Sequence, residues 1–238
     1  MTTTHLNVTT HSFTDCSVQA AALAERVAER LRMALNQRGH ALLAVSGGST
    51  PKDFFAHLSR ESLDWTNVKI TLVDERWVPD TDERSNAKLV KSTLLQNEAA
   101  GAEFVPLYTD APTPEDGIAA TVARIGELTL PFDAVILGMG DDGHTASFFP
   151  GGDRLADALD LNGKDRVLPM RAPDAGEPRI TLTLPTLLET ESLFLLVTGN
   201  KKRDILADVR LGLNTAHDYP VRSVLVQNRV PVAVYWCP

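Results

Sequence analysis

The stretch DAVILGMGDDGHTASFFPG, residues 133–151, decides how this sequence folds and where its chemistry lies. Residues 133–137 form a short apolar run bounded by glycine, which is typical of an inner strand of an α/β sheet. The three glycines within residues 138–143 then allow the backbone to turn sharply and to approach a ligand. Because open α/β sheets bind ligands beyond the carboxyl ends of their strands, His144 is the first candidate for a catalytic group.

Strands and helices are predicted to alternate on both sides of this stretch. Apolar runs predict strands, and helical spacing or capping residues predict helices. The predicted strands are 41–45, 68–73, 104–107, 133–137, 179–184, 193–198 and 232–236, and the predicted helices are 17–38, 51–58, 85–95, 113–128 and 201–211. This order favours a three-layer α/β fold, with a mostly parallel Rossmann-like sheet covered by helices on both faces. No repeat or linker divides residues 1–238, so we expect a single domain.

The composition is that of a soluble globular protein. Hydrophobic residues make up 43% and charged residues 23% of the 238 residues, and a chain of this length can bury a core without a disulfide or a metal. The formal charge of −8 argues against nucleic acid or an anionic membrane as a partner. It leaves room for a small anion in a locally basic pocket.

The two cysteines lie near opposite ends of the chain. Cys16 and Cys237 form no CxxC pair, so a zinc or redox site on thiols is not expected, and both fit a reducing compartment. The N-terminal residues 1–13 lack a basic region followed by an apolar core, and no apolar run approaches the ~18 residues of a membrane span. We therefore expect a cytoplasmic protein.

Small residues join a predicted strand to a predicted helix at SGGSTP, residues 46–51. Backbone N–H groups and hydroxyls in such a turn can hold a phosphate at the positive end of a helix. The same residues also suit a tight turn that uses glycine for geometry alone, and both interpretations stay open. The nucleoside triphosphate motif GxxxxGK[ST] is absent, which argues against a kinase.

The glycines at 138, 140 and 143 also fit the dinucleotide motif GxGxxG. That motif requires a long helix that opens at its last glycine. Here Pro150 and the glycines after it would end a helix within about two turns. The context therefore argues against a nicotinamide cofactor.

Three charged clusters are candidates for a site. His144 follows Asp141 and Asp142, which suits an oriented general base, although metal ligation by the same three residues competes. Residues 74–76 (DER) follow a predicted strand and are either helix-capping partners or site groups. Residues 201–203 (KKR) open a helix, where cations are poorly placed unless an anion is near; a solvated basic patch is the alternative.

Taken together and in order, these motifs resemble the 6-phosphogluconolactonase family over nearly the whole chain. They are SGGSTP (46–51), DERWVP (74–79), SNAKL (85–89), LGMGDDGHTASFFPG (137–151), RITLT (179–183) and GNKK (199–202). The resemblance implies hydrolysis of 6-phospho-D-glucono-1,5-lactone to 6-phospho-D-gluconate in the oxidative pentose phosphate pathway, with no metal or organic cofactor. The resemblance implies that the substrate is a small phosphorylated sugar lactone. We expect a monomer or small homo-oligomer.

The resemblance implies a role for each motif. His144 would be the general base that deprotonates water, Asp142 would orient it, and Asp74 would complete the catalytic set by binding sugar hydroxyls. The substrate-binding residues would be Gly47, Gly48, Ser49, Thr50, Arg76, Gly140, Arg171, Arg179 and Lys202. The segment before RITLT, residues 172–178, departs from the lysine- and proline-rich pattern that the family often shows there, so it is not expected to contact phosphate.

Two alternatives share this pattern. Amino-sugar-6-phosphate isomerases that release ammonia resemble it at Asp74, Asp142 and His144, but carry a glutamate where this chain has Phe149. They also tend to have an aromatic residue where Arg76 stands. A non-catalytic sugar-phosphate sensor of the same fold would usually travel with a DNA-binding helix-turn-helix, and the residues before 41 offer only one helix without a basic face.

Overall fold

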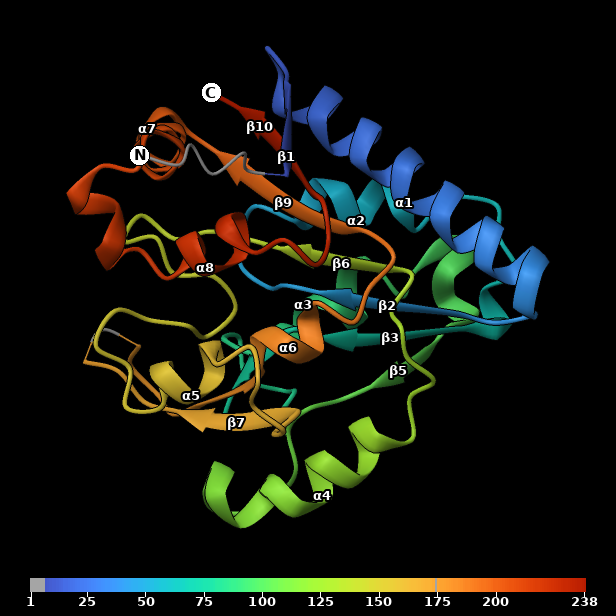
Figure 1. Ribbon diagram of the computed structural model, residues 1–238. Helices are drawn as coiled ribbons and strands as arrows, with labels where there is room; N and C mark the ends of the chain where they lie inside the picture. Colours follow the sequence, from blue (N-terminus) through green and yellow to red (C-terminus); the bar gives the residue numbers. More distant parts are fainter. Residues whose placement is uncertain (1–6, 174) are drawn as a thin grey trace.

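A seven-stranded parallel sheet forms the centre of the computed structural model, which describes residues 7–173 and 175–238 (Figure 1). Its strand order is β1-β10-β9-β6-β2-β3-β5, and every neighbouring pair in it is parallel. The strands are β1 (Val8–Ser12), β2 (Ala41–Val45), β3 (Val68–Leu72), β5 (Glu103–Val105), β6 (Ala134–Leu137), β9 (Leu193–Thr198) and β10 (Val232–Cys237). The sequence prediction of a mostly parallel α/β sheet is confirmed.

The apolar run of the opening stretch becomes an inner strand of this sheet. β6 lies between β2 and β9, and all residues of β2 and β6 are buried. Strands covered on both faces need continuous apolar side chains, which is why these two runs show no polar alternation. β6 therefore delivers the glycine-rich turn and His144 to the carboxyl edge of the sheet.

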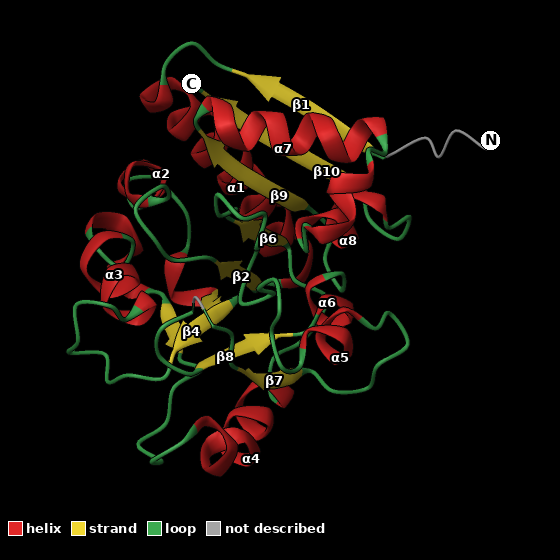
Figure 2. Cartoon of the chain, turned by 90° about the vertical axis from the view of Figure 1, so that its left-hand side faces the viewer, coloured by secondary structure: helices red, strands yellow, loops and turns green. Residues whose placement is uncertain are grey.

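Helices cover both faces of the sheet. They are α1 (Cys16–Arg38), α2 (Lys52–Leu58), α3 (Asn86–Thr93), α4 (Pro114–Gly126), α5 (Leu155–Leu159), α6 (Leu184–Leu187), α7 (Asn200–Leu211) and α8 (Val221–Val226). Figure 2 shows α2 and α3 on one side of the stacked strands and α6 and α8 on the other. Within residues 7–173 and 175–238, no helix has the length and apolar character needed to cross a bilayer.

A second, antiparallel sheet changes the expected course of the chain after β3. It has the order β4-β8-β7, with β4 (Asp74–Arg76), β8 (Arg179–Leu182) and β7 (Val167–Met170). Asp74–Arg76 follow the carboxyl end of an inner strand, β3, as predicted, but they also form a strand of the second sheet, which was not predicted. Val73 donates to Val45 while its carbonyl accepts from Leu182. The chain thus passes from one sheet to the other at Val73, a change that the continuous apolar run does not reveal.

The two cysteines are also joined in a way that the sequence did not predict. A disulfide connects Cys16 to Cys237 across 221 residues of sequence, with their Cα atoms 5.3 Å apart. The expectation of two thiols fails because β1 and β10 pair in parallel and bring the end of the chain beside the start of α1. Spacing in the sequence carries no information about that proximity.

Candidate active site

A cavity of about 310 Å³ opens where β2 and β6 end and the second sheet begins. Its lining includes all but two of the predicted site residues, Asp142 and Arg171 being the exceptions. The lining residues are Ser46, Gly47, Gly48, Ser49, Thr50, Asp74, Arg76, Asn86, Gly138, Met139, Gly140, His144, Ala146, Phe149, Arg179 and Lys202. The fold therefore brings together groups that lie far apart in the chain, from Ser46 to Lys202.

Asp142 stands behind His144 and fixes the orientation of its ring. The Oδ1 atom of Asp142 lies 2.6 Å from Nδ1 of His144 and also accepts the backbone N–H of His144 at 3.0 Å. This arrangement favours the tautomer with the proton on Nδ1, so that Nε2 is left as the acceptor. Burial by itself raises the pKa of the Asp142 carboxyl, but the hydrogen bonds from the ring and backbone of His144, with the charge of the ring, bring it to about 2.

The glycine turn makes room for this pair. A Cβ atom on Gly140 would lie 2.2 Å from Nδ1 of His144 and 2.7 Å from Oδ1 of Asp142. Gly143 has a φ of +76°, and a Cβ atom there would lie 2.7 Å from the side chain of Tyr219. Both positions therefore require glycine. The contacts with His144, Asp142 and Tyr219 account for these two glycines, and no dinucleotide-binding role is needed to explain them.

Phe149 packs between two polar groups of the pocket. Its ring centroid lies 4.5 Å from that of His144, and the guanidinium of Arg179 lies 5.4 Å over the same ring. The side chain is buried, with 6% of its surface exposed, and it lines the cavity. The ring limits rotation of the imidazole and supplies no group that can carry a proton.

The Ser46–Thr50 turn, between β2 and α2, forms a second wall of the cavity. A Cβ atom on Gly47 would overlap Oδ1 of Asn86, at 1.8 Å. Gly48 has a φ of +93°, which other residues rarely adopt. The missing side chain of Gly47 thus lets the turn come close to the start of α3, and Gly48 allows the left-handed backbone of the turn.

Two arginines contribute positive charge to the cavity. The Nε atoms of Arg76 and Arg179 are buried and have no hydrogen-bond partner among the described residues. Burial lowers the pKa of the Arg179 guanidinium from its ordinary value, although the nearby Asp74 opposes that shift. An arginine remains charged even so, and these unpartnered donors suit an anionic ligand.

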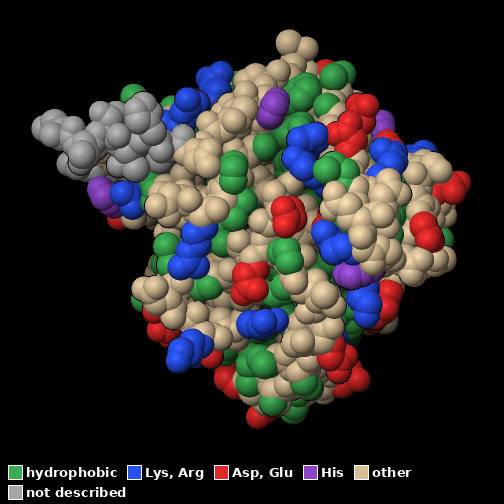
Figure 3. All heavy atoms as spheres, turned by 45° about the vertical axis from the view of Figure 1, so that its right-hand side comes forward, with side chains coloured by type: hydrophobic (Ala, Val, Ile, Leu, Met, Phe, Trp, Pro, Cys, Tyr) green, Lys and Arg blue, Asp and Glu red, His purple; other side chains and the backbone are tan. Residues whose placement is uncertain are grey.

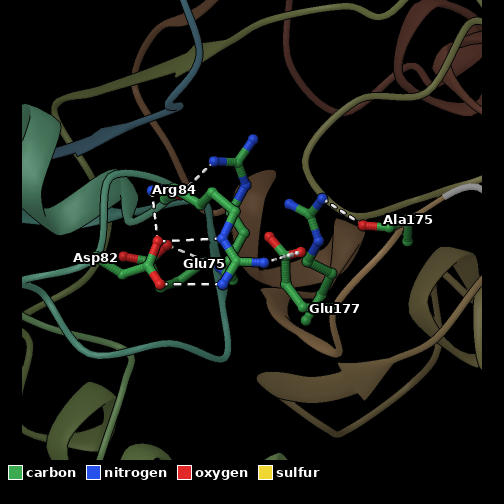
Figure 4. Close-up of polar contacts among 7 residues, drawn as sticks. Glu75, Asp82, Arg84, Ala175 and Glu177 are labelled. Atoms are coloured by element: carbon green, nitrogen blue, oxygen red, sulfur yellow. Dashed lines mark hydrogen bonds and ion pairs between the residues drawn. The ribbon is translucent and has the colours of Figure 1, made fainter.

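Arg84 joins the segments that carry these arginines. It makes ion pairs with Asp82 and with Glu177, both at 3.0 Å, and Figure 4 shows its side chain between the two carboxylates. The backbone carbonyl of Arg84 accepts a hydrogen bond from Arg76. Hydrogen bonds from Arg84 lower the pKa of Asp82 to about 2. The segment before α3 is thus connected to the segment before β8.

The basic cluster at the start of α7 has a carboxylate beside it. The Nζ atoms of Lys201 and Lys202 lie 3.8 and 3.9 Å from the two oxygens of Asp141. Only Lys202 lines the cavity, and its side chain is 19% exposed, compared with 71% for Lys201. Lys202 is therefore the site residue of this cluster.

Asp74 is held at the cavity wall by Ser147. The buried hydroxyl of Ser147 donates to Oδ2 of Asp74 at 2.6 Å, and the side chain of Asn86 donates to the backbone carbonyl of Asp74 at 2.9 Å. The structure thus adds Asn86 to the cavity and Ser147 behind it. The SNAKL motif contained Asn86, but no pattern in the sequence assigned it a role.

Arg171 lies outside the cavity. Its guanidinium pairs with both carboxylate oxygens of Glu115 on α4, and this pairing lowers the pKa of Glu115 to about 2. Asp174, in the divergent segment 172–178, falls outside the described residues. On the face that Figure 3 shows, acidic and basic side chains of the described part of the chain are interspersed.

The competing metal interpretation of Asp141, Asp142 and His144 has no support in the geometry. Among residues 7–173 and 175–238, no three histidine, cysteine, aspartate or glutamate side chains come together as a metal-ligand group. Asp142 instead points to Nδ1 of His144, while Asp141 faces the lysines of α7.

The chain is similar to known proteins over nearly its whole length. The family described as glucosamine-6-phosphate isomerases/6-phosphogluconolactonase matches residues 14–236. A 6-phosphogluconolactonase of Rhizobium meliloti (strain 1021) is 48% identical over 228 residues, which cover 96% of this chain and 98% of that protein. One of Pseudomonas aeruginosa is 43% identical over 220 residues, or 92% of this chain and 91% of that protein.

Solved structures give the same result. The crystal structure of a 6-phosphogluconolactonase from Shewanella baltica OS155 has a TM-score of 0.92 and 38% sequence identity, and the match covers 97% of this chain and 98% of that one. A monomeric glucosamine-6-phosphate deaminase has a TM-score of 0.74 with 17% identity over 94% of this chain and 96% of that one, so it shares the fold alone.

Proposed function

We propose that this chain, which belongs to the glucosamine-6-phosphate isomerase/6-phosphogluconolactonase family, hydrolyses 6-phospho-D-glucono-1,5-lactone to 6-phospho-D-gluconate in the oxidative pentose phosphate pathway. The observation that carries this proposal is the oriented base. His144, which is held by Asp142, lines the same cavity as the cations of Arg76, Arg179 and Lys202. A base and several cations in one small cavity suit an anionic ester substrate.

His144 starts the reaction as a general base. Its Nε2 takes a proton from water while the water oxygen attacks C1 of the lactone, and the carbonyl electron pair moves to oxygen. The carboxylate of Asp142 stabilises the imidazolium that forms. A base placed in this way contributes about 10² to 10⁴ in rate.

The tetrahedral intermediate then opens the ring. The C1–O5 bond breaks, the carbonyl forms again, and the proton held by His144 passes to O5 as it leaves. N–H donors of Arg179 or Arg76 stabilise the oxyanion, and one such donor is worth about 3 kcal/mol. The products are a carboxylic acid, which ionises, and a hydroxyl group, so atoms and charges balance.

The other wall of the cavity binds the phosphate and the sugar. In this proposal Gly47, Gly48, Ser49, Thr50 and Lys202 hold the phosphate, since turn N–H groups, hydroxyls and an ammonium are its ordinary partners. Asp74 accepts hydrogen bonds from sugar hydroxyls, because Ser147 occupies one of its oxygens and the other is left for a ligand. Gly140 has no side chain, so the backbone at this position can come close to the substrate.

An amino-sugar-6-phosphate isomerase is not favoured. That reaction moves protons between neighbouring carbons and needs a further acid or base close to the histidine. Here Phe149 packs against the imidazole at 4.5 Å between ring centroids and cannot relay a proton. A sensor that binds without turnover would not need the oriented base.

One assay separates these functions. Purified protein is given freshly prepared lactone and, separately, glucosamine 6-phosphate, and acid release and ammonia are followed. We expect acid release above the spontaneous rate and no ammonia. Ammonia without lactone consumption would overturn the proposal, and binding of 6-phosphogluconate without either product would favour a sensor.

We also propose that the chain works as a single cytoplasmic domain, as a monomer or small homo-oligomer, with neither nucleic acid nor membrane as a partner. The family match spans residues 14–236 without interruption, and the net charge of −8 disfavours anionic polymers and surfaces. A phosphorylated sugar is a charged metabolite, which supports a site inside the cell.

A further inference from the structure

The buried carboxylate of Glu75 lies behind the wall of the cavity and does not line it. Glu75 has no exposed surface, and its side chain accepts four hydrogen bonds. Oε1 accepts the backbone N–H groups of Arg76 at 2.7 Å and Asn86 at 2.8 Å. Oε2 accepts the backbone N–H of Ala87 at 2.7 Å and the hydroxyl of Ser85 at 3.0 Å.

Three of these four donors belong to the start of α3. Ser85 is the N-cap, and its hydroxyl also accepts the N–H of Lys88 at 3.1 Å. The negative charge of Glu75 therefore sits at the positive end of this helix, where it is favourable. Glu75 itself is the middle residue of β4, paired with Ile180 of β8. Its side chain thus connects α3 to the second sheet.

The backbone positions that Glu75 holds carry two side chains of the cavity, Arg76 and Asn86. Asn86 in turn packs against Gly47, where no Cβ atom would fit, and donates to the carbonyl of Asp74. A shift at the start of α3 would therefore move the guanidinium of Arg76 and the contact between Asn86 and the Gly47 turn together.

We propose that Glu75 is a positioning residue for the lactone site, whose carboxylate sets Arg76 and Asn86 at the cavity wall through their backbone N–H groups. The inference rests on the proposed function. It adds a group that does not touch the substrate, and it gives a role to a buried carboxylate next to Arg76, a residue that lines the cavity.

The substitution Glu75→Gln tests the role of the carboxylate with little change in volume. An amide keeps one acceptor oxygen, but its NH₂ group cannot accept from Ala87 or from Ser85. We expect kcat/KM to fall by about 10- to 100-fold, the cost of a displacement on the order of 1 Å at a site. The Kd for 6-phosphogluconate, measured by calorimetry, is expected to rise, which means that binding becomes weaker. Glu75→Asp, which keeps the charge on a shorter side chain, should recover part of both losses.

Asp15→Ala is the matched control for loss of a helix cap. The carboxylate of Asp15 accepts the N–H groups of Ser17 at 2.7 Å and Val18 at 3.2 Å at the start of α1, outside the cavity. This variant should lose thermal stability but keep the kcat/KM and the Kd of the parent protein. An equal loss of activity in both variants would mean that Glu75 acts only through stability, and would overturn the inference.

A double-mutant cycle with Arg76→Met identifies the route of the effect. If Glu75 acts through Arg76, Glu75→Gln should change kcat/KM much less in the Arg76→Met background than in the parent. Fully multiplicative effects, or a folded Glu75→Gln protein with parental kcat/KM and Kd, would contradict the proposal. If Glu75→Gln does not fold, the same cycle with Glu75→Asp decides. Calorimetry needs no turnover. A protein without lactonase activity would refute the proposed function, but the effect of Glu75→Gln on the Kd could still be measured and would test the role of Glu75.

Discussion

At the scale of single residues, the cavity depends on glycines at positions where neighbouring atoms leave no room for a side chain. A methyl group on Gly140 would lie 2.2 Å from Nδ1 of His144, closer than any real contact. The substitution Gly140→Ala must therefore push the ring away from Asp142 or shift the turn. The sequence indicated that these glycines bend the chain, but only the structure shows which side chains they face.

We expect Gly140→Ala to reduce kcat by about 10²-fold or more, because a displacement of about 1 Å can cost that much. Gly126→Ala is the control, since nothing lies within 4 Å of a Cβ at that position at the end of α4. That control should keep its activity and gain about 0.4–1 kcal/mol in free energy of unfolding. Steady-state kinetics and urea unfolding of both variants check this, and a fully active Gly140→Ala enzyme would contradict the geometry.

Residue types that carry chemistry were predictable from the sequence, whereas supporting residues were not. The motifs placed His144, Asp142 and Lys202 at strand ends or helix starts, and the structure brings them to one place. Asn86 and Ser147 are ordinary polar residues whose partners, Gly47 and Asp74, lie far away in sequence. No local pattern distinguishes them from surface residues.

At the scale of elements, the sequence predicted the strands of the main sheet better than those of its neighbour. Fully buried apolar runs such as β2 and β6 are unambiguous. β1 was missed because only its first residue is partly buried and the other four are exposed at the edge of the sheet. β4 and β7 have only three and four residues, so neither gives a periodic signal.

The structure of the second sheet also shows which of two arginines belongs to the site, a choice between Arg171 and Arg179 that the sequence left open. Arg179, at the start of β8, lines the cavity, whereas Arg171 is paired with Glu115 of α4. We therefore expect Arg179→Met to lower kcat/KM by about 10²-fold or more, a typical loss when a donor to developing charge is removed. Arg171→Met should leave kcat/KM within about twofold, because an exposed ion pair contributes little. The opposite order in kinetics at fixed ionic strength would show that Arg171 reaches the substrate.

At the scale of the whole molecule, the chain is closed by a covalent bond that the sequence did not predict. The disulfide between Cys16 and Cys237 ties the start of α1 to the last strand, across 221 residues. Cytoplasmic thiols are usually kept reduced. In the proposed cytoplasmic location, the redox conditions of the cell therefore decide whether Cys16 and Cys237 form the disulfide or two thiols.

We expect reduction of this bond to destabilise the fold without stopping the reaction, because neither cysteine lines the cavity. A cross-link over a long loop limits the unfolded chain and typically contributes about 2–4 kcal/mol. Urea unfolding of the oxidised protein, the reduced protein and the Cys16→Ser/Cys237→Ser variant measures this difference. Identical unfolding midpoints for all three would contradict the prediction.

The pH dependence of the rate follows from the His144–Asp142 pair. The pKa of Asp142 is lowered to about 2, below its ordinary value of 3.8, so its carboxylate stabilises the fold above the ordinary value and loses this effect only as the pH falls through about 2. Between pH 5 and 8 Asp142 stays charged. Loss of the Asp142 charge therefore cannot account for a change of rate in this window. A general base acts only in its unprotonated form, so we expect the rate to fall toward the acid end of the window.

The measurement that tests the central claim most directly compares the parent enzyme with His144→Asn, by lactone hydrolysis between pH 5 and 8 and by calorimetry of 6-phosphogluconate. We expect the variant to lose about 10² to 10⁴ in kcat, to lose the acid limb of the pH profile and to keep nearly the parental Kd. A variant that retains parental kcat and the same pH profile would show that His144 is not the base.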